Sequence, residues 1–170
     1  MENFHISGAK LSDYPSFIKG LAITKKAAAI ANEKVGMVTK EQCDAIVKAC
    51  DELLEGKHHE HFPVDMIQGG AGTSTNMNAN EVIANRALEI MGKERGQYEF
   101  CSPNDHVNGS QSTNDAYPCG IHMAMYMEHL EFIGHIEMVI ESLEKKAFLS
   151  PHLGHTFQYF SKSKPHFSQL

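Results

Sequence analysis

The pattern of hydrophobic and polar positions predicts helices joined by polar segments. A first helix is expected over residues 14–35, because Pro15 suits the first turn of a helix and an alanine-rich run follows it. A second is expected from Thr39 to Gly56. Thr39 and Gln42 have the spacing of a capping box, and hydrophobic residues then recur every three to four positions. A glycine follows each of the two helices.

Two further helices are expected over residues 80–91 and 115–146. The first ends at Gly92, and the second has Pro118 in its first turn and hydrophobic residues along one face. A helix of about 30 residues is long against a mean of roughly 11–12, so it is expected to pack against helices outside this sequence. Because no strand pattern stands out, the fold class is predicted to be mainly α.

Two polar segments carry the candidate chemistry. Residues 69–81 read Gly-Gly-Ala-Gly-Thr-Ser-Thr-Asn-Met-Asn-Ala-Asn-Glu, and residues 102–118 read Ser-Pro-Asn-Asp-His-Val-Asn-Gly-Ser-Gln-Ser-Thr-Asn-Asp-Ala-Tyr-Pro. Glycines let a ligand approach the backbone, and hydroxyl and amide groups ahead of a helix suit a carboxylate. Taken alone, the first segment is as compatible with a plain turn and the second with an N-cap. The occurrence of both favours an anion site.

Both strings resemble the first two signature sequences of the aspartases, the aspartate ammonia-lyases of the aspartase/fumarase superfamily. The resemblance extends from about residue 2 to residue 146. Class II fumarases are similar over the same strings. However, Ala71, Ser102 and Thr113 stand where the fumarases usually have serine, histidine and serine, and these differences favour aspartase.

The resemblance implies a reversible elimination of ammonia from L-aspartate to give fumarate, a reaction that uses no cofactor and for which no metal ligand is assigned. Removing the proton beside the β-carboxylate places extra negative charge on that carboxylate, which preorganised donors stabilise. The resemblance assigns the role of donors and substrate anchors to Thr73, Ser112, Thr113 and Asn114. In the complete family, subunits form homotetramers around a central helical bundle, and each active site draws on three subunits.

By the same resemblance, residues 1–114 form an N-terminal helical domain and residues 115–147 begin a truncated central helical bundle. Residues 148–170 are a tail that does not match the family. The family's Gly-Ser-Ser-x-Met-Pro loop, whose serine is the catalytic base, does not occur in the sequence, so no residue is assigned as catalytic. The chain is interpreted as the N-terminal portion of an aspartase, expected to be inactive and poorly soluble alone.

Composition favours an ordinary cytoplasmic domain. Fifteen basic against 21 acidic residues give a net charge of −6, and no basic cluster suggests nucleic-acid binding. No hydrophobic run has the length of a membrane span. The four cysteines lack Cys-x-x-Cys spacing and are expected to be reduced thiols.

A histidine-rich stretch, His58-His59-Glu60-His61, is a weaker candidate for chemistry. A metal site is one interpretation. A solvated loop is favoured, because adjacent side chains are expected to diverge and the His-Glu-x-x-His spacing of a helical zinc site is missing. The sequence therefore predicts no metal site.

Two other functions stay open. One is a class II fumarase-like hydratase, which an assay of the complete protein with malate in place of aspartate would separate from an aspartase. The other is a non-catalytic remnant that co-assembles with a full-length relative through the long helix. Co-purification with a complete aspartase would favour this second alternative.

Overall fold

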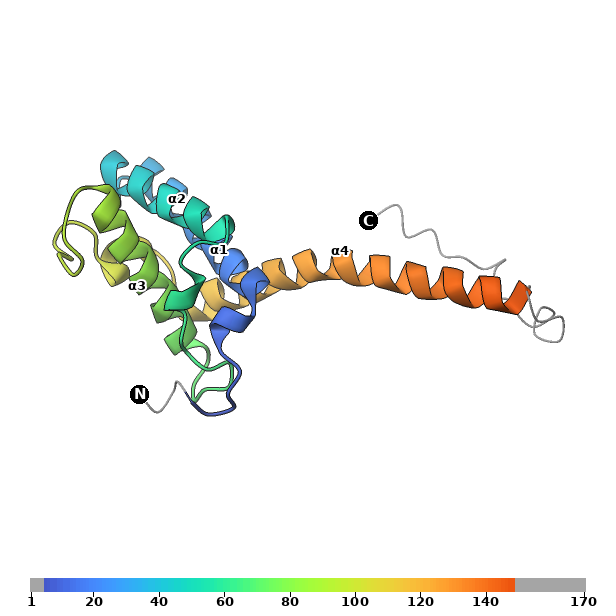
Figure 1. Cartoon of the computed structure of the whole chain (residues 1–170). Coiled ribbons are helices and arrows are strands. Elements are labelled where there is room, and N and C mark those ends of the chain that lie inside the picture. Colours follow the sequence, from blue (N-terminus) through green and yellow to red (C-terminus); the bar gives the residue numbers. More distant parts are fainter. Residues whose placement is uncertain (1–4, 149–170) are drawn as a thin grey trace. The chain divides into compact units, whose positions relative to one another are not determined.

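The computed structural model describes residues 5–148, which are mainly helical, as the sequence predicts (Figure 1). No strand occurs in this range, where a single antiparallel bridge joins Lys10 and Asp65. The predicted tail covers residues 148–170 and, apart from Phe148, lies outside the described residues. The elements in chain order are η2 (Leu11–Asp13), α1 (Pro15–Lys34), α2 (Lys40–Leu54), η3 (His59–His61), α3 (Thr73–Ile90), η4 (Pro103–Val107) and α4 (Thr113–Phe148).

The first two helices begin and end where the sequence signals lie. Pro15 occupies the first turn of α1. At the start of α2 the predicted capping box is present: the Gln42 N–H donates to Thr39 Oγ1 over 3.2 Å, and the Thr39 N–H donates to Gln42 Oε1 over 2.9 Å. Gly56, just beyond α2, has a φ of 88°, a conformation that glycine adopts without steric cost.

Helix α3 begins at Thr73, seven residues before the predicted start at Asn80. Gly72 precedes it with a φ of 86°. The sequence does not predict the first two turns of α3, because their inward-facing residues include Thr75, Asn76 and Asn80, which are polar yet almost fully buried. A search for hydrophobic periodicity does not detect a helical face whose burial depends on hydrogen bonds.

Helix α4 runs two residues further at each end than predicted. Pro118 lies inside the helix, in its second turn, so the predicted placement in the first turn is wrong. Proline has no N–H to donate to the carbonyl one turn earlier, and this part of α4 therefore lacks one helical hydrogen bond.

The chain divides into two compact units between residues 127 and 128, within α4. The domain boundaries predicted from the sequence stay a prediction. In the first unit, α1 packs on α2 and α2 packs on α3. The largest fully buried hydrophobic side chains of this core are Leu11, Ile18, Leu21, Ile46, Leu53, Phe62, Ile83, Leu88 and Val107.

Two glycines let α1 approach the first turns of α4. A Cβ built on Gly20 would lie 2.2 Å from the carbonyl oxygen of Gly120. A Cβ built on Gly120 would lie 2.8 Å from Leu21 Cδ2. Because neither position has room for a side chain, this close helix contact depends on glycine in both helices.

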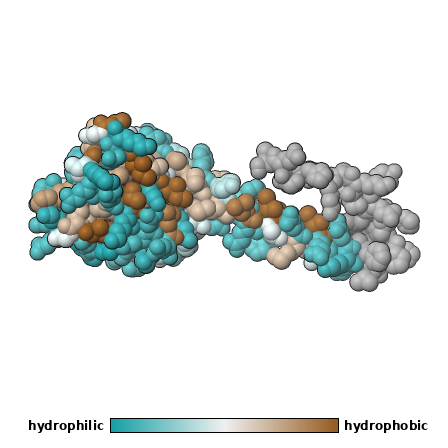
Figure 2. All heavy atoms as spheres, turned by 90° about the horizontal axis from the view of Figure 1, so that it is seen from above, coloured by the Kyte–Doolittle hydropathy of each residue, from teal (hydrophilic) through white to brown (hydrophobic). Residues whose placement is uncertain are grey.

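The second unit contains the rest of α4. On the face drawn in Figure 2, this part of the helix carries both hydrophobic and hydrophilic residues. Its exposed large hydrophobic residues are Leu130, Phe132, Ile136, Met138, Val139, Ile140 and Leu143. Among the described residues, no helix combines the length and the hydropathy that a membrane crossing requires.

Candidate functional site

The four predicted substrate residues lie at the starts of two helices. Thr73 is the first residue of α3 and Thr113 is the first residue of α4. Ser112 immediately precedes α4, and Asn114 is its second residue. Thr73, Ser112 and Asn114 are exposed, and Thr113 is half-buried.

A glycine and an aromatic ring bring the starts of α3 and α4 together. Gly72 lies so close to the ring of Tyr117 that a Cβ there would approach Tyr117 Cγ to 2.5 Å. Tyr117 is in turn held by Phe17 of α1 in an edge-to-face contact, with ring centroids 5.6 Å apart. The beginning of a helix presents unpaired N–H groups and a partial positive charge, so two helix starts side by side favour an anion.

Beneath the helix starts, one amide oxygen joins both polar segments. Asn108 Oδ1 accepts hydrogen bonds from Asn76 Nδ2 over 3.1 Å and from Asn80 Nδ2 over 3.2 Å. It also accepts one from Lys25 Nζ over 2.9 Å. Asn76 Nδ2 further donates to Thr113 Oγ1 over 3.1 Å. This network, the Asn108 network, links α1, α3 and the segment before α4 to a predicted substrate residue.

Lys25 is the buried cation of this network. Its side chain is inaccessible to solvent, and Nζ donates to Asn108 Oδ1 and, over 3.0 Å, to Gln111 Oε1. Both partners are neutral amides. Burial therefore lowers the pKa of Lys25 to about 8, although the nearby charge of Asp115 acts in the opposite direction.

Several buried amide oxygens in this region accept no hydrogen bond from the protein. They are Oε1 of Gln68 and Oδ1 of Asn76, Asn78 and Asn80. Two of these residues, Asn76 and Asn80, already direct their NH₂ groups to Asn108. A buried carbonyl without a donor is costly, so these oxygens are expected to accept from water or from a bound N–H group.

Asp65 ties the beginning of the described chain to the loop ahead of α3. Its carboxylate accepts from the N–H groups of Ile6, Ser7, Gly8 and Ile67 and from the Ser7 hydroxyl, over 2.7–3.0 Å. Burial alone would raise the pKa of Asp65, but these hydrogen bonds outweigh it and hold the pKa well below its usual range.

Sequence reasoning missed Lys25, Asn76, Asn80, Asn108 and Asp65 as parts of this region. The three asparagines lie inside the signature strings, and this position could have identified them as candidate site residues. Nothing in the sequence marks Lys25 or Asp65 as a site residue, because a lysine in a helix and an aspartate in a loop are ordinarily solvated.

All four cysteines are free thiols, as the sequence predicts. Cys119 is exposed, and the other three are buried. Burial raises the pKa of Cys50 to about 12 and that of Cys101 to about 11. Such thiols stay protonated near neutral pH and are poor nucleophiles.

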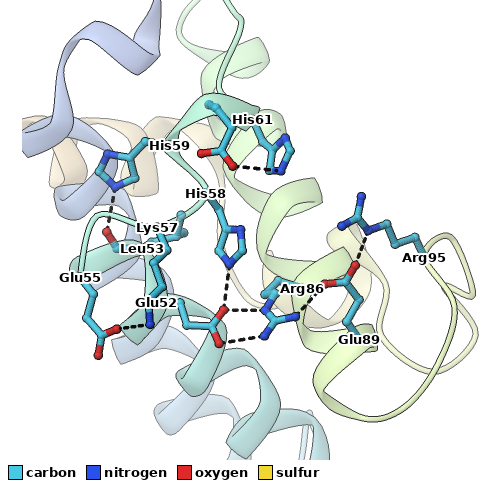
Figure 3. A network of polar contacts seen from close by, with 11 residues as sticks. Glu52, Leu53, Glu55, Lys57, His58, His59, His61, Arg86, Glu89 and Arg95 are labelled. Carbon is cyan, nitrogen blue, oxygen red and sulfur yellow. Dashed lines mark hydrogen bonds and ion pairs between the residues drawn. The ribbon is translucent and has the colours of Figure 1, made fainter.

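A separate group of charged residues lies between α2, η3 and α3 (Figure 3). Glu52 accepts from Nε of Arg86 over 2.5 Å and from Nη2 over 2.9 Å, and Arg86 Nη1 donates to Glu89 over 2.8 Å. Glu89 is also paired with Arg95. A cavity of about 520 Å³ beside this group is lined in part by His58, His61, Glu81, Arg86 and Glu89 and by none of the four predicted substrate residues.

Comparison with known proteins identifies the class of this helical chain. A family of proteins described as lyases matches residues 1–150. The chain belongs to this lyase family.

Its curated relatives include aspartate ammonia-lyases. The one from Helicobacter pylori strain J99 is 54% identical over 146 residues, which cover 86% of this chain and 31% of that protein. The one from Escherichia coli K12 is 51% identical over 148 residues, again 86% of this chain and 31% of the relative. The chain thus spans less than a third of the length of these relatives.

Two solved structures are similar to this chain in fold and in sequence. A fumarate lyase:delta crystallin from Brucella melitensis in native form superposes with a TM-score of 0.83 at 47% identity, covering 86% of this chain and 34% of that one. A class II fumarase from Schistosoma mansoni superposes with a TM-score of 0.66 at 38% identity, covering 75% of this chain and 26% of that one.

Proposed function

We propose that this chain carries the substrate-carboxylate-binding portion of an aspartate ammonia-lyase, which converts L-aspartate to fumarate and ammonia. The observation that carries this proposal is the identity of 54% and 51% to two aspartate ammonia-lyases over 86% of the chain, including both polar segments. The class II fumarase matches less of the chain at lower identity, so a hydratase is the second candidate.

Two hydroxyl groups are arranged to donate to an anion. Thr113 Oγ1 accepts from Asn76 Nδ2, and Ser112 Oγ accepts from the N–H of Asn114 over 3.2 Å. With an acceptor position of each oxygen occupied by the protein, the hydroxyl protons are available for a bound carboxylate. Thr73, at the start of α3, is proposed as a third hydroxyl donor and Asn114 as an amide donor.

Lys25 supports these donors from beneath. Its ammonium group orients the oxygen of Asn108, and the NH₂ groups of Asn76 and Asn80 are thereby held toward that oxygen. Donors fixed before the reaction need no reorganisation when negative charge develops on the substrate carboxylate. We assign Lys25 and Asn108 as positioning residues and Thr73, Ser112, Thr113 and Asn114 as substrate-binding residues.

This chain is proposed to bind the substrate but not to catalyse the complete reaction. The base that removes the proton is assigned to no residue here, because the family's serine loop does not occur in the sequence. We expect the purified chain to be inactive. Formation of fumarate from L-aspartate by the chain alone, followed by absorbance near 240 nm, would contradict this.

A chimera tests the substrate-binding role. Residues 5–146 of this chain would replace the matching segment of the Escherichia coli aspartate ammonia-lyase, which is 51% identical. We expect fumarate formation from L-aspartate, and a loss of about 10²-fold or more in kcat/KM for Thr113→Val. Thr24→Val is the matched control, because the Thr24 hydroxyl donates only to the Gly20 carbonyl of its own helix over 3.0 Å.

Each outcome of this experiment decides between candidates. A folded chimera that acts on L-malate and not on L-aspartate would favour the hydratase. Equal activity of the Thr113→Val chimera and its parent would refute the assigned role. A folded chimera inactive on both substrates would favour a non-catalytic remnant.

Assembly and location belong to the same proposal. The exposed hydrophobic residues of α4 beyond residue 127 fit a helix that packs in a homotetrameric bundle, as the resemblance implies. Light scattering on the chimera tests this, with a tetramer as the expected result. Four free thiols support a reducing, cytoplasmic location, which fractionation of the source cells would test.

A further inference from the structure

The histidine-rich stretch folds into a tight turn that gathers its side chains. His58 has a φ of 64°, which is uncommon for a residue with a side chain, and η3 follows it directly. Side chains three residues apart eclipse one another in a turn of this kind. The rings of His58 and His61 accordingly stack, with centroids 6.1 Å apart and an interplanar angle of 14°.

Three ligand atoms converge as a result. One atom each from His58, Glu60 and His61 lies within 4.8 Å of the other two. The sequence-based expectation that these neighbouring side chains diverge is therefore wrong for these three residues. Tetrahedral ligands at about 2.0–2.2 Å from a zinc ion lie roughly 3.3 Å apart, and the exposed side chains of Glu60 and His61 can rotate to close the difference.

His58 is held in place by a carboxylate behind it (Figure 3). Its Nε2 lies 3.0 Å from Glu52 Oε2, and the Glu52 side chain is only 14% exposed. Each oxygen of the Glu52 carboxylate also accepts a hydrogen bond from the Arg86 guanidinium, an arrangement of an ionised carboxylate, which can only accept. Nε2 of His58 is then the donor, which leaves the lone pair of Nδ1 free for a metal ion.

We propose that His58, Glu60 and His61 form a binding site for a zinc-like divalent transition-metal ion, with Glu52 orienting His58 from behind. Two imidazoles and one carboxylate are ligands typical of zinc, whereas magnesium and calcium prefer oxygen alone. A carboxylate that accepts from the remote nitrogen of a ligating histidine is the usual support of such a site. The site borders the cavity lined by Glu81 and Arg86, which leaves further coordination positions for water.

Zinc titration of the full chain tests this proposal. The metal-free chain would compete with a chromophoric zinc chelator for Zn²⁺, in a Cys119→Ser background because that thiol is exposed. We expect one equivalent to bind more tightly than the remaining histidines do. His61→Ala and Glu60→Gln, both at exposed positions, are expected to weaken binding at least tenfold.

His59→Ala is the matched control. The His59 ring is bonded to the carbonyl oxygen of Leu53 over 2.8 Å and lies outside the converging group. We expect unchanged zinc affinity for this variant. Equal affinity of the parent, His61→Ala and His59→Ala, or the absence of a stoichiometric equivalent in the parent, would overturn the proposal.

A second variant tests the orienting role of Glu52. Glu52→Gln, compared with the parent by circular dichroism to verify its fold, is expected to lose about 10- to 100-fold in zinc affinity. A folded Glu52→Gln chain with full affinity would show that His58 needs no support from this carboxylate and would refute that part of the proposal.

Discussion

Lys25 and Asn108, 83 positions apart in the chain, are joined by a 2.9 Å hydrogen bond from Nζ to Oδ1. This bond connects the buried face of α1 to the second polar segment. The same oxygen receives the NH₂ groups of Asn76 and Asn80 from the first polar segment. The two signature strings therefore meet at Asn108, which belongs to the second string, and Lys25, which lies outside both strings, donates to the same oxygen.

Because of Lys25, the free energy of unfolding is expected to change with pH in the alkaline range. The folded pKa of Lys25, about 8, lies below its ordinary value of 10.5, so between these values the unfolded chain binds the proton that the folded chain has released. The free energy of unfolding therefore rises with pH across this window, by roughly 3 kcal/mol in total, and this gain is absent below pH 8.

Comparison with Lys25→Met isolates this effect. The parent should gain stability relative to Lys25→Met as the pH is raised from 8 to 10.5, in urea unfolding followed by circular dichroism. Taking the difference between the two proteins removes the contribution of Cys50 and Cys101, whose raised pKa values lower stability above about pH 9 in both. Parallel curves for the two proteins would contradict the assignment of Lys25 as a buried cation.

The parts of the fold that the sequence predicts are those determined by local signals. Helix α2 was found because its capping box and its hydrophobic spacing depend only on neighbouring residues. The start of α3 was missed because Asn76 and Asn80 are buried through hydrogen bonds to the distant Asn108. No local pattern shows that an asparagine in a polar segment is buried.

In the candidate site, too, some residues are predicted from local sequence and others are found only in the structure. Thr73, Ser112, Thr113 and Asn114 were predicted from the signature strings and do lie at helix starts, and their role in binding substrate stays a prediction. Lys25 looks like a surface residue of an amphipathic helix until the fold places it against Asn108 and Gln111. The gathering of His58, Glu60 and His61 depends on the positive φ of His58, which no sequence rule anticipates.

The glycine contact between α1 and α4 is expected to tolerate no side chain. Gly20→Ala should destabilise the first unit by about 1–3 kcal/mol, because the new Cβ would lie 2.2 Å from a backbone oxygen that has little freedom to move. Gly134→Ala is the matched control within α4, where no atom lies within 4 Å of an added Cβ. There alanine should raise helix stability by up to about 1 kcal/mol.

Urea unfolding monitored at 222 nm compares the two glycine variants. The expected result is opposite signs, with a lower midpoint for Gly20→Ala and an equal or higher one for Gly134→Ala. A Gly20→Ala chain as stable as the parent would show that the two helices do not approach each other as closely as the structure has them.

The thiols are expected to react in an order set by burial. Cys119 is exposed, whereas Cys50 is fully buried and its pKa is raised to about 12. Iodoacetamide at pH 8 should therefore modify Cys119 first and Cys50 only after unfolding, because the thiolate is the reactive form. Mass spectrometry of peptides before and after urea treatment measures this order. Equal labelling rates for Cys50 and Cys119 in the native chain would contradict the described core.

Asp65 is expected to support the fold at neutral pH and to lose this effect in acid. The folded pKa of its carboxyl lies below the ordinary value, so its contribution to stability is complete above that value and declines as the pH falls below about 4. Asp65→Asn removes the charge that faces four backbone N–H groups. The Tm of this variant should be lower than that of the parent at pH 7, and the difference in Tm between the two proteins should become smaller toward pH 3.

Asp44→Asn provides the control for this series, because Asp44 forms only an exposed pair with Lys40 and such pairs contribute little. Its Tm at pH 7 should stay close to that of the parent. Thermal unfolding of the three proteins between pH 3 and pH 7 gives the comparison. If the Tm of Asp65→Asn stayed below that of the parent by the same amount over this range, the loss of stability would come from altered packing and not from the charge. The negative charge of Asp65 would then not stabilise the fold through its hydrogen bonds with Ser7, Gly8 and Ile67.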